Sequence, residues 1–271
     1  MSNVPRLSRM LAIALLLGAG SARAFDHGHG AWDELLRRTV VVLAPGNASQ
    51  VRYADMLKER AALRRYLDQL SAVDTGEYGN WPRPQQLAFL IHAYNAFTVE
   101  LILGSYPKLG SIRDLGGFFQ SPWKRKFFRL LGSERHLDEI EHDLIRAPGV
   151  FDEARIHVAL VCASVGCPML RNEAFVAGRL ETQLEDSLRR FLSDRSRNRF
   201  DGDRGVLWLS KLFDWYGRDF AGPRSRYATL QERLKPYANV LADDAASRAR
   251  IQAGDYRIDF LDYDWTLNDV R

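Results

Sequence analysis

Cysteine is scarce in this sequence: only two of its 271 residues are cysteine, Cys162 and Cys167. A framework of several disulfides is therefore excluded. The chain also lacks G-x-G-x-x-G, the Walker loop, G-x-S-x-G and H-E-x-x-H, so no motif supports a nucleotide-binding protein, a serine hydrolase or a zinc protease. No internal repeat, low-complexity tract or long Gly/Ser linker interrupts it, which favours one domain.

The first residues predict a secretory signal peptide. Arg6 and Arg9 precede an apolar run from Leu11 to Leu17, and Ala22-Arg23-Ala24 forms an A-x-A exit. The run is shorter than the roughly 20 residues that a membrane span needs, and no later uninterrupted apolar run approaches that length. We expect cleavage after Ala24 and a periplasmic or secreted protein with no membrane span in the mature chain.

The net charge of +4 depends largely on this leader. Removing residues 1–24 takes away three arginines and no acid, which leaves 35 of the 38 basic residues against 34 acidic ones. The remaining charges are interspersed, as in "LETQLEDSLRRFLSDR", and this pattern is typical of an ordinary solvated surface. We expect no nucleic-acid partner.

Helical and extended patterns mix along the chain without regular alternation, which favours an α+β fold: one helix-rich domain with a small β-sheet. We expect residues 25–80 to be a helical N-terminal segment and residues 81–271 to be the main domain. Residues 82–103 begin with prolines and are apolar on nearly every side, so they predict a buried central helix. His92 and Asn95 should share one of its faces.

Further elements follow from local patterns. The short run "IHVALVC" (156–162) is rich in β-branched residues and predicts a buried strand. Residues 176–191 carry an apolar stripe and predict an amphipathic helix. A hairpin is expected around Asp201-Gly202, and the alternation in "DYRIDF" (255–260) predicts another strand.

Several motifs together resemble one known family. In order they are "AYNAF", "SPWKRKFF", "LDEIEHDLIR", "RIHVALVCASVGCPML", "LSKLFDWYGRDF" and "LDYDWTLN", between Trp81 and Leu267. They are similar to the family known as domain of unknown function 547, and the resemblance implies no particular reaction. The family pattern has Trp-Ile-Asn where this chain has Leu90-Ile91-His92, whereas Tyr94 and Asn95 match it.

The cysteines have two interpretations, and the first is catalysis. A thiol-dependent hydrolase or transferase would use Cys162 or Cys167 with a histidine base. On a strand, His157 and Cys162 would point to opposite faces, so they would not form a local pair. His142 is then the best candidate base, His157 is the alternative, and Asn95 is the candidate for orienting the ring.

The second interpretation is a structural bridge. Four residues separate Cys162 and Cys167, and a turn there can bring their α-carbons within the roughly 4.4 to 6.8 Å that a disulfide requires. The chain would then be a non-enzymatic binding or scaffold domain. Tyr94 and Asn95 would be buried structural groups, and a small molecule or peptide would bind the aromatic residues Trp123, Trp208, Trp215, Tyr216 and Trp265.

Metal binding is expected only under one condition. If the mature chain starts at Phe25, His27 is third from the free amine and can bind Cu(II) or Ni(II) together with backbone nitrogens. The alternative is an incidental polar start. An internal zinc site of His142, His157 and a cysteine has suitable ligand types but lacks paired ligand spacing. The sequence names no cofactor.

Overall fold

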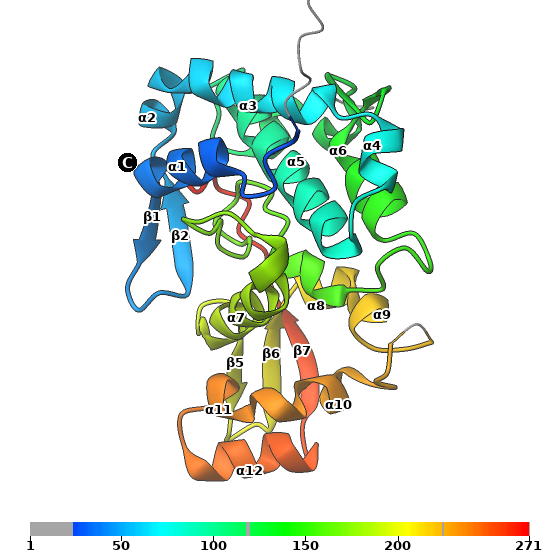
Figure 1. Ribbon diagram of the computed structural model, residues 1–271. Helices are drawn as coiled ribbons and strands as arrows, with labels where there is room; N and C mark the ends of the chain where they lie inside the picture. The colour runs from blue at the N-terminus through cyan, green and yellow to red at the C-terminus, as the bar shows by residue number, and fades with distance from the viewer. Residues whose placement is uncertain (1–23, 118–119, 224, 271) are drawn as a thin grey trace, which may run out of the picture.

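The computed structural model describes residues 24–117, 120–223 and 225–270. Apart from Ala24, the predicted signal peptide lies outside the described residues. Helix accounts for 50% of the chain and strand for 13%, which confirms the predicted helix-rich α+β domain (Figure 1).

One α-helix of 21 residues is longer than the other described helices. The α-helices are α1 (Gly30–Thr39), α2 (Tyr53–Lys58), α3 (Arg60–Ala72), α4 (Thr75–Gly79), α5 (Arg83–Leu103), α6 (Leu137–Glu139), α7 (Leu180–Ser193), α8 (Leu212–Trp215), α9 (Gly217–Phe220), α10 (Leu230–Leu234), α11 (Ala238–Leu241) and α12 (Ala245–Ala253). A π-helical stretch, Ile140–Ile145, directly continues α6. Short 3₁₀ turns cover Ile112–Leu115, Pro122–Lys124, Ala154–Val158, Ala177–Arg179 and Lys235–Tyr237.

The strands form three small sheets. They are β1 (Val40–Leu43), β2 (Ala48–Val51), β3 (Phe128–Leu130), β4 (Ser133–Arg135), β5 (Arg199–Asp201), β6 (Val206–Ser210) and β7 (Arg257–Leu261). β1–β2 and β3–β4 are antiparallel pairs. β6 pairs antiparallel with β5 and parallel with β7. The hairpin and the late strand predicted for this last sheet are confirmed, whereas the β1–β2 hairpin interrupts the N-terminal segment that was predicted to be helical.

The central helix α5 is buried as predicted. Pro82 and Pro84 stand at its start, where a missing backbone N–H costs nothing, and residues 87–99 are all buried. Among the described residues α5 is long and apolar enough to cross a membrane, but 89% of its most apolar window is buried inside the fold. Its apolar surface is therefore covered by this chain's own helices, α3 foremost among them.

Helix α7 joins two apolar cores. Leu180 and Leu184 belong to the core around α5, whereas Leu188 and Phe191 belong to the core that packs on the β5–β6–β7 sheet. In Figure 1, α7 lies between the helical part at the top and the sheet at the bottom. The apolar stripe at helical spacing thus serves both cores, and the predicted amphipathic helix is confirmed.

The strand predicted for 156–162 is wrong. The segment begins as the 3₁₀ turn Ala154–Val158 and continues as irregular chain. Its backbone groups find partners other than a neighbouring strand: the Asn95 amide donates to the Ala159 carbonyl at 2.8 Å and accepts from the Val161 N–H at 2.9 Å. A short buried apolar run has the same sequence pattern whether it forms a strand or an irregular segment whose backbone groups hydrogen-bond to a side chain.

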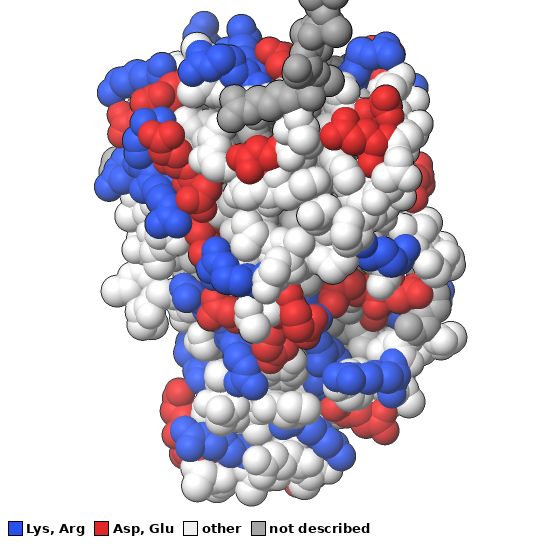
Figure 2. Space-filling model, viewed as in Figure 1, with Lys and Arg blue, Asp and Glu red and all other residues white. Residues whose placement is uncertain are grey.

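Charges on the surface are mixed. On the face shown in Figure 2, basic and acidic side chains lie interspersed, and neither sign forms a continuous patch. The expected lack of a nucleic-acid partner stays a prediction.

Candidate functional site

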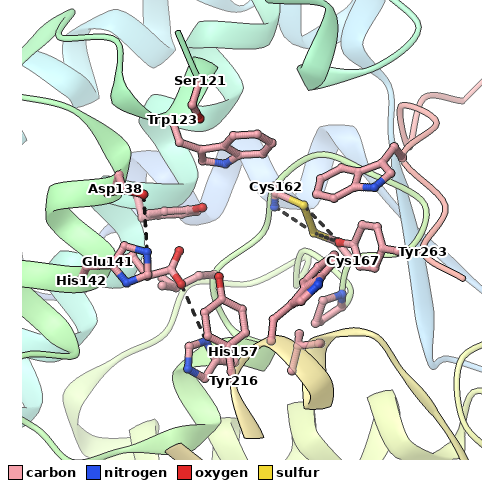
Figure 3. A pocket seen from close by; sticks show the side chains of 16 residues that line it. Ser121, Trp123, Asp138, Glu141, His142, His157, Cys162, Cys167, Tyr216 and Tyr263 are labelled. Atoms are coloured by element: carbon pink, nitrogen blue, oxygen red, sulfur yellow. Dashed lines mark hydrogen bonds and ion pairs between the residues drawn. A yellow bond between two sulfur atoms is a disulfide. The ribbon is translucent and has the colours of Figure 1, made fainter. Parts of the chain in front are cut away.

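A cavity of ≈ 310 Å³ lies where the two cores meet, and its lining comes from distant parts of the chain. Tyr94 reaches it from α5, and Asp138, Glu141 and His142 reach it from α6 and the π-helical stretch. The segment after the Ala154–Val158 turn supplies both cysteines (Figure 3). The remaining walls come from Ser121 and Trp123 at the Pro122–Lys124 turn, from α8 and the adjoining Tyr216, and from the residues that follow β7.

Four of the five residues proposed from sequence as catalytic line this cavity: Cys162, Cys167, His142 and His157. Asn95 is not among its lining residues. Its amide holds residues 159–161 against α5, which fits the structural role considered for it. Because no strand forms at 156–162, the argument that separated His157 from Cys162 no longer applies.

The two cysteines form a disulfide, with their α-carbons 6.3 Å apart. This is the structural bridge considered from the sequence, and it uses every cysteine in the chain. A sulfur in a disulfide carries neither a proton nor a charge, so neither cysteine is a nucleophile in this state.

Hydroxyl and amide groups surround the bridge. The Tyr263 hydroxyl donates to Cys167 Sγ at 3.1 Å and accepts from Ser164 Oγ at 3.0 Å. The backbone N–H of Cys162 also donates to Cys167 Sγ, at 3.0 Å. Burial raises the pKa of Tyr263 to about 12, so its hydroxyl keeps its proton at neutral pH.

A close backbone approach places Tyr263 beside the bridge. The Gly166 N–H donates to the Asp264 carbonyl and the Val165 N–H to the Thr266 carbonyl, both at 2.8 Å. A Cβ on Gly166 would lie 2.9 Å from that Asp264 oxygen. Glycine is therefore the residue that lets the two segments pack this tightly.

His157 is held between two carboxylates on the opposite wall. Its Nε2 lies 2.8 Å from Asp219 Oδ2, its Nδ1 lies 3.8 Å from Glu141 Oε1, and its ring stacks on Tyr216 with centroids 3.8 Å apart. The side chain is buried, and this burial lowers the pKa of His157 despite the raising effect of both carboxylates. The neutral ring donates its Nε2 proton to Asp219.

His142 is engaged in a different set of contacts. Its Nε2 lies 3.4 Å from Asp138 Oδ1, its Nδ1 accepts a hydrogen bond from the Arg146 guanidinium, and its side chain is 37% exposed. Within the described part of the chain, no hydrogen bond joins His142 or His157 to either sulfur. The structure therefore brings the cysteines and histidines to one cavity without pairing them.

Sequence reasoning missed Tyr263, Glu141 and Asp219. Tyr263 lies inside the quoted "LDYDW" motif and Asp219 inside "YGRDF", but only the folded chain shows which member of each motif faces the bridge or His157. Trp208 was named with the cavity aromatics, yet it lies on β6 and does not line the cavity.

The predicted copper or nickel site at His27 stays a prediction. The His27 ring packs edge-on against Trp81 with centroids 4.5 Å apart, and its buried Nδ1 has no hydrogen-bond partner. Over the described ranges, no group of three or more His, Cys, Asp or Glu side chains could hold a metal ion. The zinc alternative with His142 and His157 thus finds no such cluster there.

Comparison with known proteins supports the resemblance. Residues 78–192 match the model of the family described as "Protein of unknown function, DUF547". The matched part includes α5, the π-helical stretch and the disulfide, and ends before α8 and Tyr263. No curated protein and no solved structure matches the chain.

Proposed function

Because residues 78–192 match a family without an assigned activity, we propose a function from the cavity itself: the chain is a binding domain for a small organic molecule that carries an ammonium group. The Cys162–Cys167 bridge holds one wall of the binding site. The observation that carries the proposal is a cavity rich in aromatic rings and carboxylates, with no lysine or arginine among its lining residues.

The aromatic wall suits a cation. Tyr263, Trp215 and Trp265 form one cluster of rings, with centroids 4.9 Å apart for Tyr263 and Trp215, 4.5 Å for Tyr263 and Trp265, and 5.7 Å for the two indoles. Trp215 is 45% exposed, although large apolar side chains normally avoid water. The electron-rich faces of such rings attract ammonium groups, by about 0.5 to 2 kcal/mol for each well-placed ring.

One nearby positive charge, that of Arg146, is already engaged. Arg146 forms an ion pair with Asp219 at 2.6 Å and lies over the Tyr216 ring at 4.8 Å. Glu141, only 7% exposed, has no lysine or arginine ion pair within the described residues. A bound cation would therefore supply the positive charge that Glu141 lacks, which favours cationic over neutral ligands.

The compartment predicted for the protein suits a disulfide in the cavity wall. The predicted export would place the protein in an oxidising compartment, where disulfides persist. A bridge on the cavity wall would then keep the binding site in one shape, and this reduces the ordering cost of binding.

The test compares a cation with a neutral molecule of the same shape. Choline and tetramethylammonium are titrated into the oxidised protein and followed by tryptophan fluorescence and calorimetry, with 3,3-dimethyl-1-butanol as the uncharged counterpart of choline. Choline should bind at least about tenfold more tightly, as one or two cation–π contacts predict. Equal binding of the two alcohols, or no binding of either cation, overturns the proposal.

Variants locate the binding site. Glu141→Gln keeps the shape and removes the charge, and Trp215→Ala removes one ring; each should weaken choline binding by about tenfold. Trp208→Phe, outside the cavity, is the matched control and should bind choline as the wild type does. If only Trp208→Phe lost choline binding, the ligand would bind outside the cavity.

A second candidate is the thiol-dependent hydrolase or transferase. It is favoured by the location of both sulfurs in one cavity with His142 and His157, and it requires a reduced bridge. Iodoacetamide labelling before and after reduction, read by intact mass, tests it. A thiol that labels at neutral pH faster than one of pKa about 8.5, and slows in His142→Ala, supports this candidate. An ordinary labelling rate excludes it.

A further inference from the structure

We infer that the Cys162–Cys167 bridge is a thiol–disulfide exchange site: a small thiol entering the cavity attacks the Cys162 sulfur, and Cys167 leaves as a thiolate. This goes beyond the binding function, in which the bridge only holds the wall. It is independent of the ligand proposed above, because an uncharged thiol is sufficient.

The first observation is access. Both cysteines of the bridge line a space of ≈ 310 Å³. The two cysteines differ in exposure: Cys162 is partly exposed, and Cys167 is only 4% exposed. A thiolate approaching through the cavity therefore reaches the Cys162 sulfur first.

The second observation is the asymmetry of hydrogen bonding. Cys167 Sγ accepts from the Cys162 backbone N–H at 3.0 Å, a donor held by the chain itself, and lies 3.1 Å from the Tyr263 hydroxyl. The described contacts of Cys162 Sγ are to hydroxyl groups, those of Tyr263 and Ser164, each at 3.2 Å. Ser164 donates to the Tyr263 hydroxyl at 3.0 Å, which strengthens Tyr263 as a donor. Hydrogen bonds to the charged form favour it, and only Cys167 Sγ has a described backbone N–H as donor, so Cys167 is the better leaving group of the two.

The surrounding backbone keeps these donors in place after the bridge opens. The Ala163 carbonyl accepts from the Asn268 N–H at 3.1 Å, and the Val165 and Gly166 N–H groups donate to the chain after β7, each at 2.8 Å. These contacts do not involve the sulfurs. The Cys162 N–H and the Tyr263 hydroxyl therefore remain next to Cys167 when it becomes a thiolate.

The exchange balances with two thiol molecules. The first loses its proton to solvent, and its sulfur bonds to Cys162 Sγ while the electron pair of the bridge moves to Cys167 Sγ. A second thiolate attacks the sulfur of the bound thiol, which releases a symmetrical disulfide and leaves Cys162 as a thiolate. The protein gains two electrons, and the two thiols lose them.

The experiment identifies which cysteine carries the incoming thiol. The oxidised full chain is incubated with 2-mercaptoethanol, quenched with acid, alkylated with N-ethylmaleimide and mapped by peptide mass. The mixed disulfide should lie on Cys162 and the maleimide on Cys167. An adduct mainly on Cys167 overturns the inference, as does a bridge that opens only under denaturing conditions.

Two variants test the leaving-group argument. Tyr263→Phe removes a hydroxyl that lies 3.1 Å from Cys167 Sγ and 3.2 Å from Cys162 Sγ. It should slow opening by about tenfold and raise the pH at which Cys167 becomes reactive. Tyr256→Phe is the matched control, because the buried Tyr256 hydroxyl has no hydrogen-bond partner. If Tyr263→Phe does not fold, Ser164→Ala retains Tyr263 and should slow opening to a smaller extent. Unchanged rates in both variants overturn the inference.

Discussion

His157 donates its Nε2 proton to Asp219 across 2.8 Å, and Arg146 donates to the same carboxylate oxygen at 2.6 Å. One carboxylate on α9 thus fixes the ring that lines the cavity and neutralises the nearest arginine. Burial alone would raise the pKa of Asp219, but the hydrogen bonds from His157 and Arg146 hold it far below its usual range. Asp219 is therefore ionised throughout the physiological range, and both donors depend on it.

Asp219→Asn should destabilise the fold by about 3 kcal/mol, because it leaves a poorly exposed arginine without its counter-charge. The pKa of Asp219 is depressed in the folded state, so its stabilisation is present above the unfolded value of 3.8 and is lost as the pH falls below it. Urea unfolding of wild type and variant should therefore show a gap at neutral pH that shrinks below about pH 4.

The control for this prediction is Asp214→Asn. Asp214 pairs with Lys211 at 2.8 Å, but both side chains are exposed, and such surface pairs contribute about 0 to 1 kcal/mol. Similar losses in the two variants would contradict the role given to Asp219.

Gly166→Ala should disturb the bridge without touching a sulfur. Its Cβ would lie 2.9 Å from the Asp264 carbonyl oxygen and 3.1 Å from Tyr263 Cδ1, and both belong to a segment fixed by backbone hydrogen bonds. We expect a loss of about 1 to 3 kcal/mol, together with displacement of Tyr263 from the sulfurs. Thermal unfolding and the near-ultraviolet signal of the cavity aromatics measure the two effects.

Gly178→Ala is the matched comparison, since a Cβ there would meet nothing within 4 Å. It should leave stability within about 0.5 kcal/mol of the wild type. An unchanged melting temperature in Gly166→Ala would show that the two segments can separate freely.

The sequence predictions were correct where a structure depends on residues close together in the sequence, and wrong where it depends on distant ones. Helices α5 and α7 are specified by their own residues, through an apolar surface or stripe at helical spacing, and both were predicted. Residues 156–162 depend instead on Asn95, whose amide replaces a strand partner from more than sixty residues away. No local pattern records such a contact.

The same reasoning applies to the site. The cysteines and histidines are chemically conspicuous and were named from the sequence, whereas Tyr263 acts through its position beside the bridge. Its place depends on the approach of the chain after β7 to Gly166. Spacing along the sequence cannot reveal this approach, because 96 residues separate Gly166 from Tyr263.

His92, the residue that departs from the family pattern, makes the fold sensitive to acid. Its Nε2 donates to the Phe175 carbonyl at 2.9 Å. Its Nδ1 is buried and has no hydrogen-bond partner among the described residues, so a proton added there would find no acceptor. Burial lowers the pKa of His92 from 6.5 to about 4. Burial and the His92 ring, at 4.2 Å between centroids, also lower the pKa of His29.

Stability should fall as the pH drops from about 6.5 towards about 4, because the unfolded chain takes up protons there and the folded chain does not. His92 alone should account for about 2 kcal/mol between pH 7 and pH 5. Urea unfolding at several pH values measures this loss. In His92→Gln the amide can still donate to Phe175 but does not titrate, so the loss should be smaller by that amount. Acid sensitivity in His92→Gln equal to that of the wild type would contradict the assignment to His92.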